Sequence, residues 1–126
     1  MEKTIIQTDA APAPIGPYSQ AVKAGNMLFV SGQIAIDPKT GNLNNADLST
    51  ETHQVMQNLL AVLTAAGMDF SNVVKTSIFL SDMSLFAAVN KVYGEYFQGQ
   101  YPARETVAVK GLPRDVRVEI SMIASA

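Results

Sequence analysis

Residues 48–66 can bury their apolar side chains together only as a helix. Apolar residues return there every three or four positions, and those that share one helical face are Val55, Leu59, Val62, Leu63 and Ala66. Asp47 or Ser49 can cap the start of this helix, and Gly67 stands where a left-handed residue commonly ends one. The segments on either side alternate apolar and polar residues, which is the period of a strand. The chain is therefore predicted to fold as an α+β domain.

The strands predicted before this helix are a hairpin and one edge strand. Residues 18–24 and 27–34 are extended runs separated by Gly25-Asn26, a dipeptide typical of tight two-residue turns. Residues 3–7 alternate briefly and are predicted as the edge strand. Residues 10–17 contain three prolines, which exclude a regular helix or a central strand and indicate a loop.

The second half of the chain is predicted to add strands around one further helix. Residues 72–80 are β-branched and aromatic, with Val74, Thr76, Ile78 and Leu80 expected on one face. A helix capped by Asp82 or Ser84 is predicted to reach about Phe97, and a strand over Tyr101–Val109 follows it. These three elements form a βαβ unit with parallel strands. With a last strand at 116–124, residues 1–126 make a single domain of about six strands and two helices.

Two helices can cover only one face of such a sheet. Several predicted strands nevertheless carry apolar residues on both faces, for example Leu28 and Val30 on one side against Met27 and Phe29 on the other. An apolar face that is left open to water favours association. We therefore expect other copies of this chain to cover the second face in a homo-oligomer.

Composition excludes several classes of site. The chain has no cysteine, which rules out a thiol nucleophile, a disulfide framework, an iron–sulfur cluster and a cysteine zinc site. Its 9 basic and 11 acidic residues give a net charge of −2, so no basic patch for a nucleic-acid backbone is expected. The single histidine, His53, argues against a protein metal site and is expected to be solvated on the polar side of the first helix.

No membrane segment is predicted. No apolar run approaches the ~20 residues that span a bilayer, and residues 1–7 lack the apolar core of a secretion signal. We therefore expect a cytoplasmic protein.

Arg104 is the first candidate for chemistry. It stands near the start of the strand Tyr101–Val109, and Thr106 and Ala108 follow on the same face. A guanidinium binds a planar carboxylate through two parallel charge-assisted hydrogen bonds. The alternative is an ordinary surface arginine.

Glu119 is the second candidate. It lies in the middle of an otherwise apolar strand, where a carboxylate is costly to bury unless it is paired or used. It is either a solvated residue or a general acid/base whose surroundings tune its pKa toward neutrality. The pattern leaves both interpretations open.

Other polar residues are candidates for lining a ligand site. Ser31-Gly32 interrupts an apolar strand, and a glycine there lets a ligand or another strand approach the backbone closely. Tyr18 is either a packed, half-buried side chain or a hydroxyl donor at a pocket mouth. Asn90 falls on the Phe86 and Tyr93 side of the second helix and can cap, pair or line a cavity, whereas Phe86 itself is interpreted as core. There is no nucleophile elbow, which argues against a serine hydrolase.

Several short motifs follow one another at fixed spacing along essentially the whole chain. They are Ile15–Ala21 (IGPYSQA), Val30–Ile34 (VSGQI), Asp37–Gly41 (DPKTG), Val74–Thr76 (VKT), Pro102–Arg104 (PAR), and Leu112-Pro113 followed by Val118–Ile120 (VEI). Together they resemble the RidA (YjgF) family of reactive-intermediate deaminases. The resemblance implies a chorismate-mutase-like α+β fold in a homotrimer, with helices outward, sheets in a central barrel and three ligand sites between subunits. It also favours a crossing of residues 110–115 to a non-adjacent strand over a hairpin.

The activity that the resemblance implies is hydrolysis of enamine/imine intermediates such as 2-aminoacrylate and 2-aminocrotonate. Pyridoxal-phosphate enzymes release these compounds, and the products are 2-keto acids and ammonia; the protein itself would need no cofactor and no metal. Matched by motif, Arg104 would hold the substrate carboxylate and Glu119 would position or activate the attacking water. The residues expected to line the site are Tyr18, Ser31, Gly32, Phe86, Asn90 and Thr106.

Thr106 marks a departure from the family pattern. Many bacterial members carry a cysteine two residues beyond the arginine of Pro-Ala-Arg, and this chain has Thr106 there. Thiol-dependent regulation therefore cannot be transferred, although the hydroxyl and the strand backbone can still contact a ligand. Glu105, between the two, is expected to point away from Arg104 by strand alternation.

Two further functions remain open from the sequence. The same arginine and cleft would serve a non-catalytic protein that binds small 2-keto acids or related carboxylates. RNA binding or cleavage, ascribed to some relatives, is disfavoured by the acidic balance and by the absence of tryptophan or a basic aromatic strip.

Overall fold

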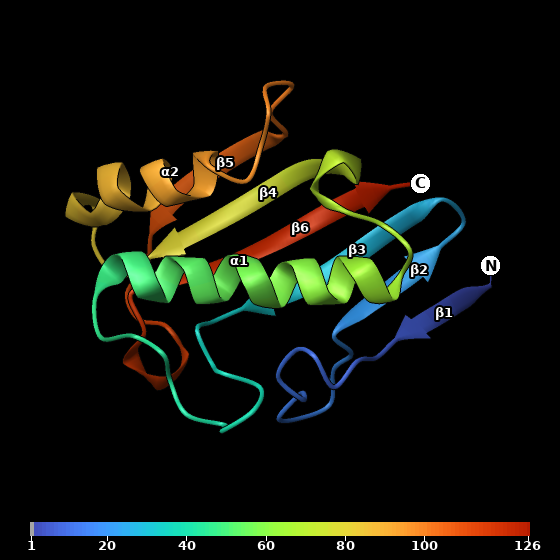
Figure 1. Ribbon diagram of the computed structural model, residues 1–126, viewed down its shortest axis with the longest axis horizontal. Helices are drawn as coiled ribbons and strands as arrows, with labels where there is room; N and C mark the ends of the chain where they lie inside the picture. The colour runs from blue at the N-terminus through green and yellow to red at the C-terminus, as the bar shows by residue number, and fades with distance from the viewer. Residues whose placement is uncertain (1) are drawn as a thin grey trace.

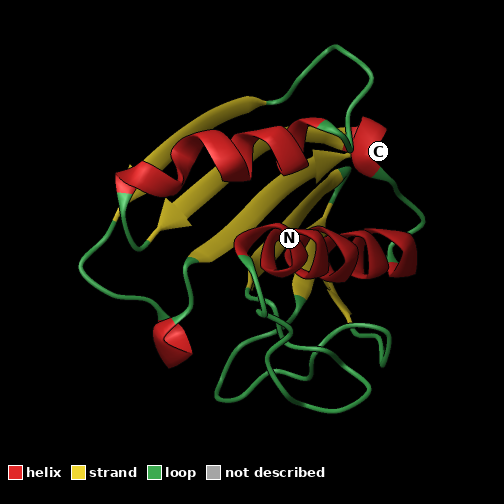
Figure 2. Cartoon of the chain, turned by 60° about the vertical axis from the view of Figure 1, so that its left-hand side comes forward, coloured by secondary structure: helices red, strands yellow, loops and turns green. Residues whose placement is uncertain are grey.

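The computed structural model describes residues 2–126 and shows a six-stranded mixed sheet with two helices on one face (Figure 1). The elements in chain order are β1 (Lys3–Ile6), β2 (Ala21–Ala24), β3 (Met27–Gln33), α1 (Leu48–Ala65), η1 (Phe70–Asn72), β4 (Val73–Leu80), η2 (Met83–Leu85), α2 (Phe86–Gly94), β5 (Ala103–Ala108), η3 (Pro113–Asp115) and β6 (Val118–Ser125). Those marked η are single turns of 3₁₀ helix. Figure 2 shows both helices on the same side of the sheet. The predicted α+β fold class is confirmed.

The strand order across the sheet is β1-β2-β3-β6-β4-β5. The hairpin of β2 and β3 turns at Gly25, whose φ of 59° lies in the left-handed region that favours glycine. β4 and β5 are parallel and joined by α2, as the βαβ prediction requires. β6 lies antiparallel between β3 and β4 and does not pair with β5, so residues 110–115 cross to a non-adjacent strand.

α1 forms where the apolar period predicted it and supplies one side of the core. Asp47, not Ser49, is its N-cap, since the Asp47 carboxylate accepts a hydrogen bond from Thr50 N at 2.7 Å. Gly67, with φ of 74°, follows its C-terminal end. The fully buried apolar residues of the helix are Val55, Met56, Leu59, Val62 and Leu63. Burying one such side chain contributes about 1.5–3 kcal/mol. No helix within residues 2–126 is long and apolar enough to cross a bilayer.

The start of β4 differs from the predicted alternation. The pairing of β4 with β6 shifts register between Val73 and Lys75, so that Val73 is buried and Val74 is 47% exposed. The prediction that Val74 shares a face with Thr76 is therefore wrong, because an irregularity in the ladder moves side chains to the other face.

The second helix is shorter than predicted. It begins with a 3₁₀ turn in which Asp82, not Ser84, is the cap, and it ends at Gly94 instead of Phe97. After Gly94 the backbone N–H groups bond three residues back, as in the 3.3 Å bond from Phe97 N to Gly94 O. The Phe97 ring still packs on Tyr93, with ring centroids 4.9 Å apart.

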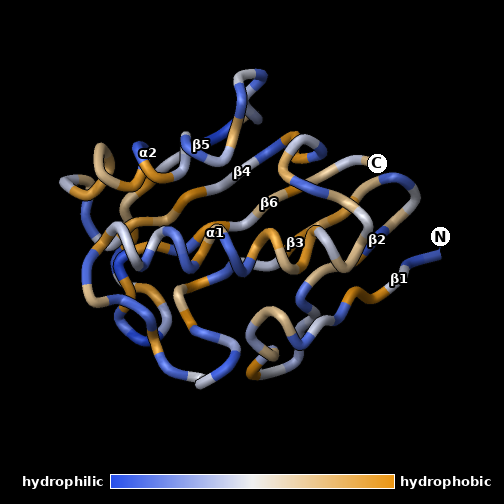
Figure 3. The backbone as a smooth tube through the Cα atoms, viewed as in Figure 1, coloured by the Kyte–Doolittle hydropathy of each residue, from blue (hydrophilic) through white to orange (hydrophobic). Residues whose placement is uncertain are grey.

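The face of the sheet away from the helices exposes apolar side chains. Apolar segments run along β3 and β6 in Figure 3, and on the outer face Phe29 is 47% and Val107 42% exposed. Beside them β4 and β5 carry an ion pair between Lys75 and Glu105, with N–O separation 3.0 Å. This is the open face that the expected homo-oligomer would cover; the oligomer itself stays a prediction.

Candidate functional site

Arg104 lies on the helix side of the sheet, facing α2. It pairs with the buried Thr76 across β4 and β5, so its side chain points to the same face as the core. Its Nη1 donates to Asn90 Oδ1 at 2.7 Å. The guanidinium carbon lies 5.6 Å from the Phe86 ring centroid and 5.2 Å from that of Tyr93, within cation–π range. The structure thus brings together Arg104, Asn90 and Phe86.

The space around Arg104 is a hollow of about 560 Å³ between α2 and the start of β5. Its walls are formed by Asn90, Tyr93, Gly94, Tyr101, Pro102 and Arg104. Tyr93 is buried and its hydroxyl donates to Thr76 Oγ1 at 3.1 Å. Burial raises the pKa of Tyr93 despite that bond and the Arg104 charge, so the phenol stays neutral and offers Arg104 its ring face.

The sequence did not single out Tyr93 or Tyr101 as wall residues. One signal was available in the spacing of Asn90 and Tyr93. The two residues are three positions apart, so they lie on the same side of the helix, and that side was expected to face a strand.

Thr106 lies two residues beyond Arg104 on the same face of β5. Its Oγ1 is sheltered from solvent and has no hydrogen-bond partner within residues 2–126. A buried hydroxyl left without a partner costs about 1–3 kcal/mol, and Thr106 is not among the residues that line the hollow around Arg104. Glu105 points the other way, as predicted, toward Lys75 and the Ser77 hydroxyl.

Glu119 lies on the opposite face of the sheet. It pairs with Phe79 on β4, whose side chain alternates with the inward-facing Ile78 and Leu80. Burial raises the pKa of the Glu119 carboxyl, and no side-chain hydrogen bond opposes this shift. Its environment is therefore one in which a carboxyl titrates closer to neutrality than usual.

Gly32 makes room for Glu119. A Cβ on Gly32 would lie 2.4 Å from Glu119 Oε2, closer than non-bonded atoms approach. β3 has its register shift between Val30 and Gln33, and Ser31 and Gly32 stand there. The sequence pointed to a close approach at this glycine, and the structure identifies a carboxylate as one neighbour.

The pocket around Glu119 has a volume of about 540 Å³. Its lining includes Tyr18, Ser31, Gly32, Ile15, Ile34 and Arg114. The Ser31 hydroxyl donates to Ser19 O at 2.6 Å, which leaves only its lone pairs for a ligand. Tyr18 is half exposed at the rim.

Gln20 holds the proline-rich loop as a wall of this pocket, a role that the sequence did not indicate. The side chain is buried, and its Oε1 accepts from Thr8 N at 2.8 Å. Its Nε2 donates to the carbonyls of Thr8, Ala11 and Pro12. The loop is therefore ordered, although proline alone could not indicate this.

One chain does not unite all the predicted site residues. Arg104, Asn90, Phe86 and Thr106 gather on the helix side, whereas Glu119, Tyr18, Ser31 and Gly32 gather around the other pocket. The cause is strand alternation, because Thr76 and Phe79, the β4 partners of Arg104 and Glu119, point to opposite faces.

His53 is not solvated as predicted. The Tyr96 hydroxyl lies 2.6 Å from His53 Nδ1, and the two rings are 5.6 Å apart. Tyr96 follows α2 in the chain and reaches back to α1, a contact between distant segments that the helix pattern could not show. Neither of the two pockets is lined by His53.

Comparison with known proteins places these residues in a family. The sequence model of the family described as Endoribonuclease L-PSP matches residues 8–126. A mouse protein named 2-iminobutanoate/2-iminopropanoate deaminase is 48% identical over 122 residues, covering 97% of this chain and 90% of the mouse protein.

Solved structures of similar proteins have the same fold over nearly the whole length of this chain. A Thermotoga maritima structure described as a putative endoribonuclease superposes with a TM-score of 0.96 at 49% identity, covering 100% of this chain and 98% of the other. The structure of E. coli TdcF with bound serine has a TM-score of 0.93 at 40% identity and covers 98% of both chains. On its sequence, its fold and the motifs that surround Arg104 and Glu119, this chain belongs to the YjgF/RidA family.

Proposed function

We propose that this protein hydrolyses small enamines and imines of the 2-aminoacrylate and 2-aminocrotonate type to 2-keto acids and ammonia. The observation that carries the proposal is Arg104, a guanidinium oriented by Asn90 and by two aromatic rings at the edge of an open hollow. The name of the mouse relative supports the same reaction. We place the activity in the cytoplasm, protecting pyridoxal-phosphate enzymes from such intermediates.

The complete site forms between subunits in this proposal. Arg104 and Glu119 lie on opposite faces of one sheet, so a second copy must bring its Glu119 pocket to the first copy's Arg104. The exposed apolar face carrying Phe29 and Val107 gives the copies a reason to associate. We propose a homotrimer with three such sites.

Arg104 would hold the substrate carboxylate through two parallel hydrogen bonds. Asn90 keeps the guanidinium in place, and Thr106, two residues along the same face of β5, is a further proposed site residue. Fixing the substrate at one end converts attack by water into a reaction of a preoriented pair.

Glu119 would act as the general base. It takes a proton from a water molecule as the water oxygen bonds to the imine carbon. It then gives this proton to the nitrogen, which forms a carbinolamine. Glu119 next moves the hydroxyl proton of the carbinolamine to the nitrogen, the C–N bond breaks, and ammonia leaves as the carbonyl forms. An enamine enters this reaction as its imine tautomer. A carboxylate with a raised pKa is better suited to this exchange at neutral pH, and such help accelerates a reaction by about 10² to 10⁴.

Arg104 variants test the proposal. In an assay that generates 2-aminocrotonate with a threonine dehydratase, we expect wild type to hasten 2-ketobutyrate formation, and both Arg104→Ala and Arg104→Lys to lose most of that effect. Lysine keeps the charge but cannot make the two-point contact. Lys91→Ala, which changes an exposed cation on α2, is the control. Near-native turnover by Arg104→Lys would count against the carboxylate clamp.

A second candidate is a non-catalytic receptor for small carboxylates. It is favoured by the E. coli TdcF structure, whose bound molecule is serine. Calorimetry with 2-ketobutyrate separates the two: a receptor would bind it in wild type and in Glu119→Ala, with no imine turnover by either. An enzyme would show turnover that Glu119→Ala abolishes.

RNA cleavage, the activity that the family description Endoribonuclease L-PSP names, is the weaker candidate. The net charge of −2 gives no general attraction to a phosphate backbone. We expect no salt-dependent RNA binding at physiological ionic strength.

A further inference from the structure

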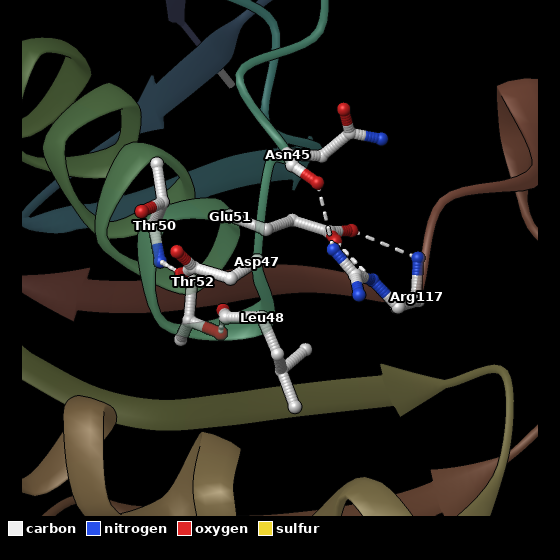
Figure 4. Close-up of polar contacts among 7 residues, drawn as sticks. All are labelled: Asn45, Asp47, Leu48, Thr50, Glu51, Thr52 and Arg117. Carbon is white, nitrogen blue, oxygen red and sulfur yellow. Dashed lines mark hydrogen bonds and ion pairs between the residues drawn. The ribbon is translucent and has the colours of Figure 1, made fainter.

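Glu51 is a fully buried carboxylate in the first turns of α1. Its Oε1 accepts from Arg117 Nε at 2.6 Å, and its Oε2 accepts from the Arg117 backbone N at 2.8 Å (Figure 4). A buried carboxylate is costly unless its oxygens are paired, and here both are bound by one residue.

Both the side chain and the backbone of Arg117 are hydrogen-bonded. Beyond its two bonds to Glu51, its Nη2 donates to Asn45 O at 2.9 Å, and its carbonyl accepts from Ser81 N at 3.0 Å. The residue stands where the chain leaves the crossing and enters β6. Two hydrogen bonds to its backbone and two from its side chain therefore fix Arg117 at the point from which β6 starts.

Glu119 follows two residues later. Its carboxylate has no hydrogen bond within residues 2–126 to orient it, so its place depends on the β6 backbone and on the gap left by Gly32. Val118, between the two, is fully buried and pairs with Leu80 on β4. Because Val118 is fixed in this way, the position of Arg117 determines where the Glu119 backbone lies.

We propose that the buried Glu51–Arg117 pair positions Glu119 by fixing the backbone at the start of β6. This rests on the proposed function only in giving Glu119 a catalytic role; the positioning itself is a property of the fold. Glu51 and Arg117 are positioning residues, because the Glu119 pocket is not lined by either of them.

The charged or titratable groups that line the pocket with Glu119 are Tyr18 and Arg114, and β3 adds Gln33. The Arg117 charge is neutralised by Glu51 at 2.6 Å. In Glu51→Gln the carboxylate that binds the Arg117 side chain and its backbone N–H is lost, so the start of β6 is held less firmly.

The test compares Glu51→Gln and Arg117→Lys with wild type by two readouts. The first is an NMR titration of the Glu119 carboxyl carbon, assigned from the signal missing in Glu119→Gln. We expect both variants to broaden or shift the Glu119 signal relative to wild type, because the carboxylate is no longer held in one position. The second is imine hydrolysis, where we expect kcat to fall about tenfold to a hundredfold with KM little changed, since small misplacements of a reacting group have such effects.

Asp47→Ala is the matched control. It removes the cap of the same helix and lowers the melting temperature, but it leaves Arg117 paired. We expect it to keep the wild-type titration and kcat. The proposal is overturned if Glu51→Gln and Arg117→Lys leave the Glu119 titration unchanged, or if Asp47→Ala alters it equally. If wild type shows no imine turnover, the proposed function fails, while the titration still decides the positioning.

Discussion

Gly32 and Glu119 share a space that admits only one side chain. The carboxylate oxygen occupies the position next to which a Cβ on residue 32 would fall, 2.4 Å away. Glu119 is the flexible partner, so a larger residue at 32 would displace the carboxylate before it disturbed the sheet.

Gly32→Ala should therefore reduce activity more than stability. We expect kcat for imine hydrolysis to fall at least about tenfold, because the general base is displaced, while the melting temperature stays within a few degrees of wild type. Gly111→Ala, where a Cβ meets nothing within 4 Å, is the control. A fully active Gly32→Ala would show that the Glu119 position is not critical.

Glu119 should also reduce the stability of the protein at neutral pH. Burial raises its pKa above the ordinary value of 4.5, so the folded state holds the proton more tightly than the unfolded state. The contribution of Glu119 to the free energy of unfolding is therefore fully present below pH 4.5, where the carboxyl is protonated in both states. It is lost as the pH rises through the raised pKa of the folded state.

Glu119→Gln should accordingly melt at a higher temperature than wild type at pH 7, with the difference vanishing near pH 4. Thermal denaturation at both values checks this. A variant that is less stable than wild type at pH 7 would mean that the carboxylate has a stabilising partner.

Among the elements, α1 buries the polar side chains of Gln54 and Asn58, although a helix that packs on the core is expected to bury apolar ones. We call this pair the polar stripe of α1. Gln54 Nε2 donates to Asn58 Oδ1 at 2.9 Å, and Asn58 Nδ2 donates to the carbonyls of Ile34 and Ile36. Ile34 and Ile36 line the Glu119 pocket. The stripe thus attaches one wall of the pocket to the helix.

Asn58→Ala should destabilise the fold through this attachment. It leaves the Ile36 carbonyl without its donor and the Gln54 side-chain N–H without its acceptor, whereas Ile34 O keeps the bond from Ile36 N. Each unsatisfied group costs about 1–3 kcal/mol. Urea denaturation should show a loss in that range or above it. Thr64→Ala, an exposed position on the same helix, should be neutral or slightly stabilising; equal effects of the two would refute the role of the stripe.

The elements themselves were largely predictable because their signals are local. The Gly25-Asn26 turn, the apolar period of α1 and the alternation of β6 each depend on residues close in sequence. The register shift at Val73 and the pairing of His53 with Tyr96 depend on partners far along the chain, so the local pattern gave the wrong face for Val74 and the wrong surroundings for His53.

The same limit explains what was missed around the candidate site. In the sequence, three polar residues of α1 look like exposed helix positions: Glu51, Gln54 and Asn58. Only the packing of α1 against the loops shows that they are buried. Arg104 was a candidate because it stands near the start of a predicted strand and can bind a carboxylate. Tyr93 beside it was placed only on the apolar side of the second helix, and it is indeed buried there.

For the whole molecule, the decisive feature is that Arg104 and Glu119 face away from each other across one sheet. Either the two groups act together across a subunit boundary, or only one of them serves the reaction. The exposed apolar side chains on the outer face favour the first possibility, because a second subunit would bury them.

Mixing two inactive variants tests this most directly. Arg104→Ala and Glu119→Ala are denatured together, refolded as a 1:1 mixture, and assayed for imine hydrolysis, with native mass spectrometry to show mixed oligomers. Sites that take Arg104 from one subunit and Glu119 from its neighbour are intact in about one quarter of random cases. We therefore predict recovery of about a quarter of wild-type activity, whereas mixed oligomers as inactive as either parent would contradict a site shared between subunits.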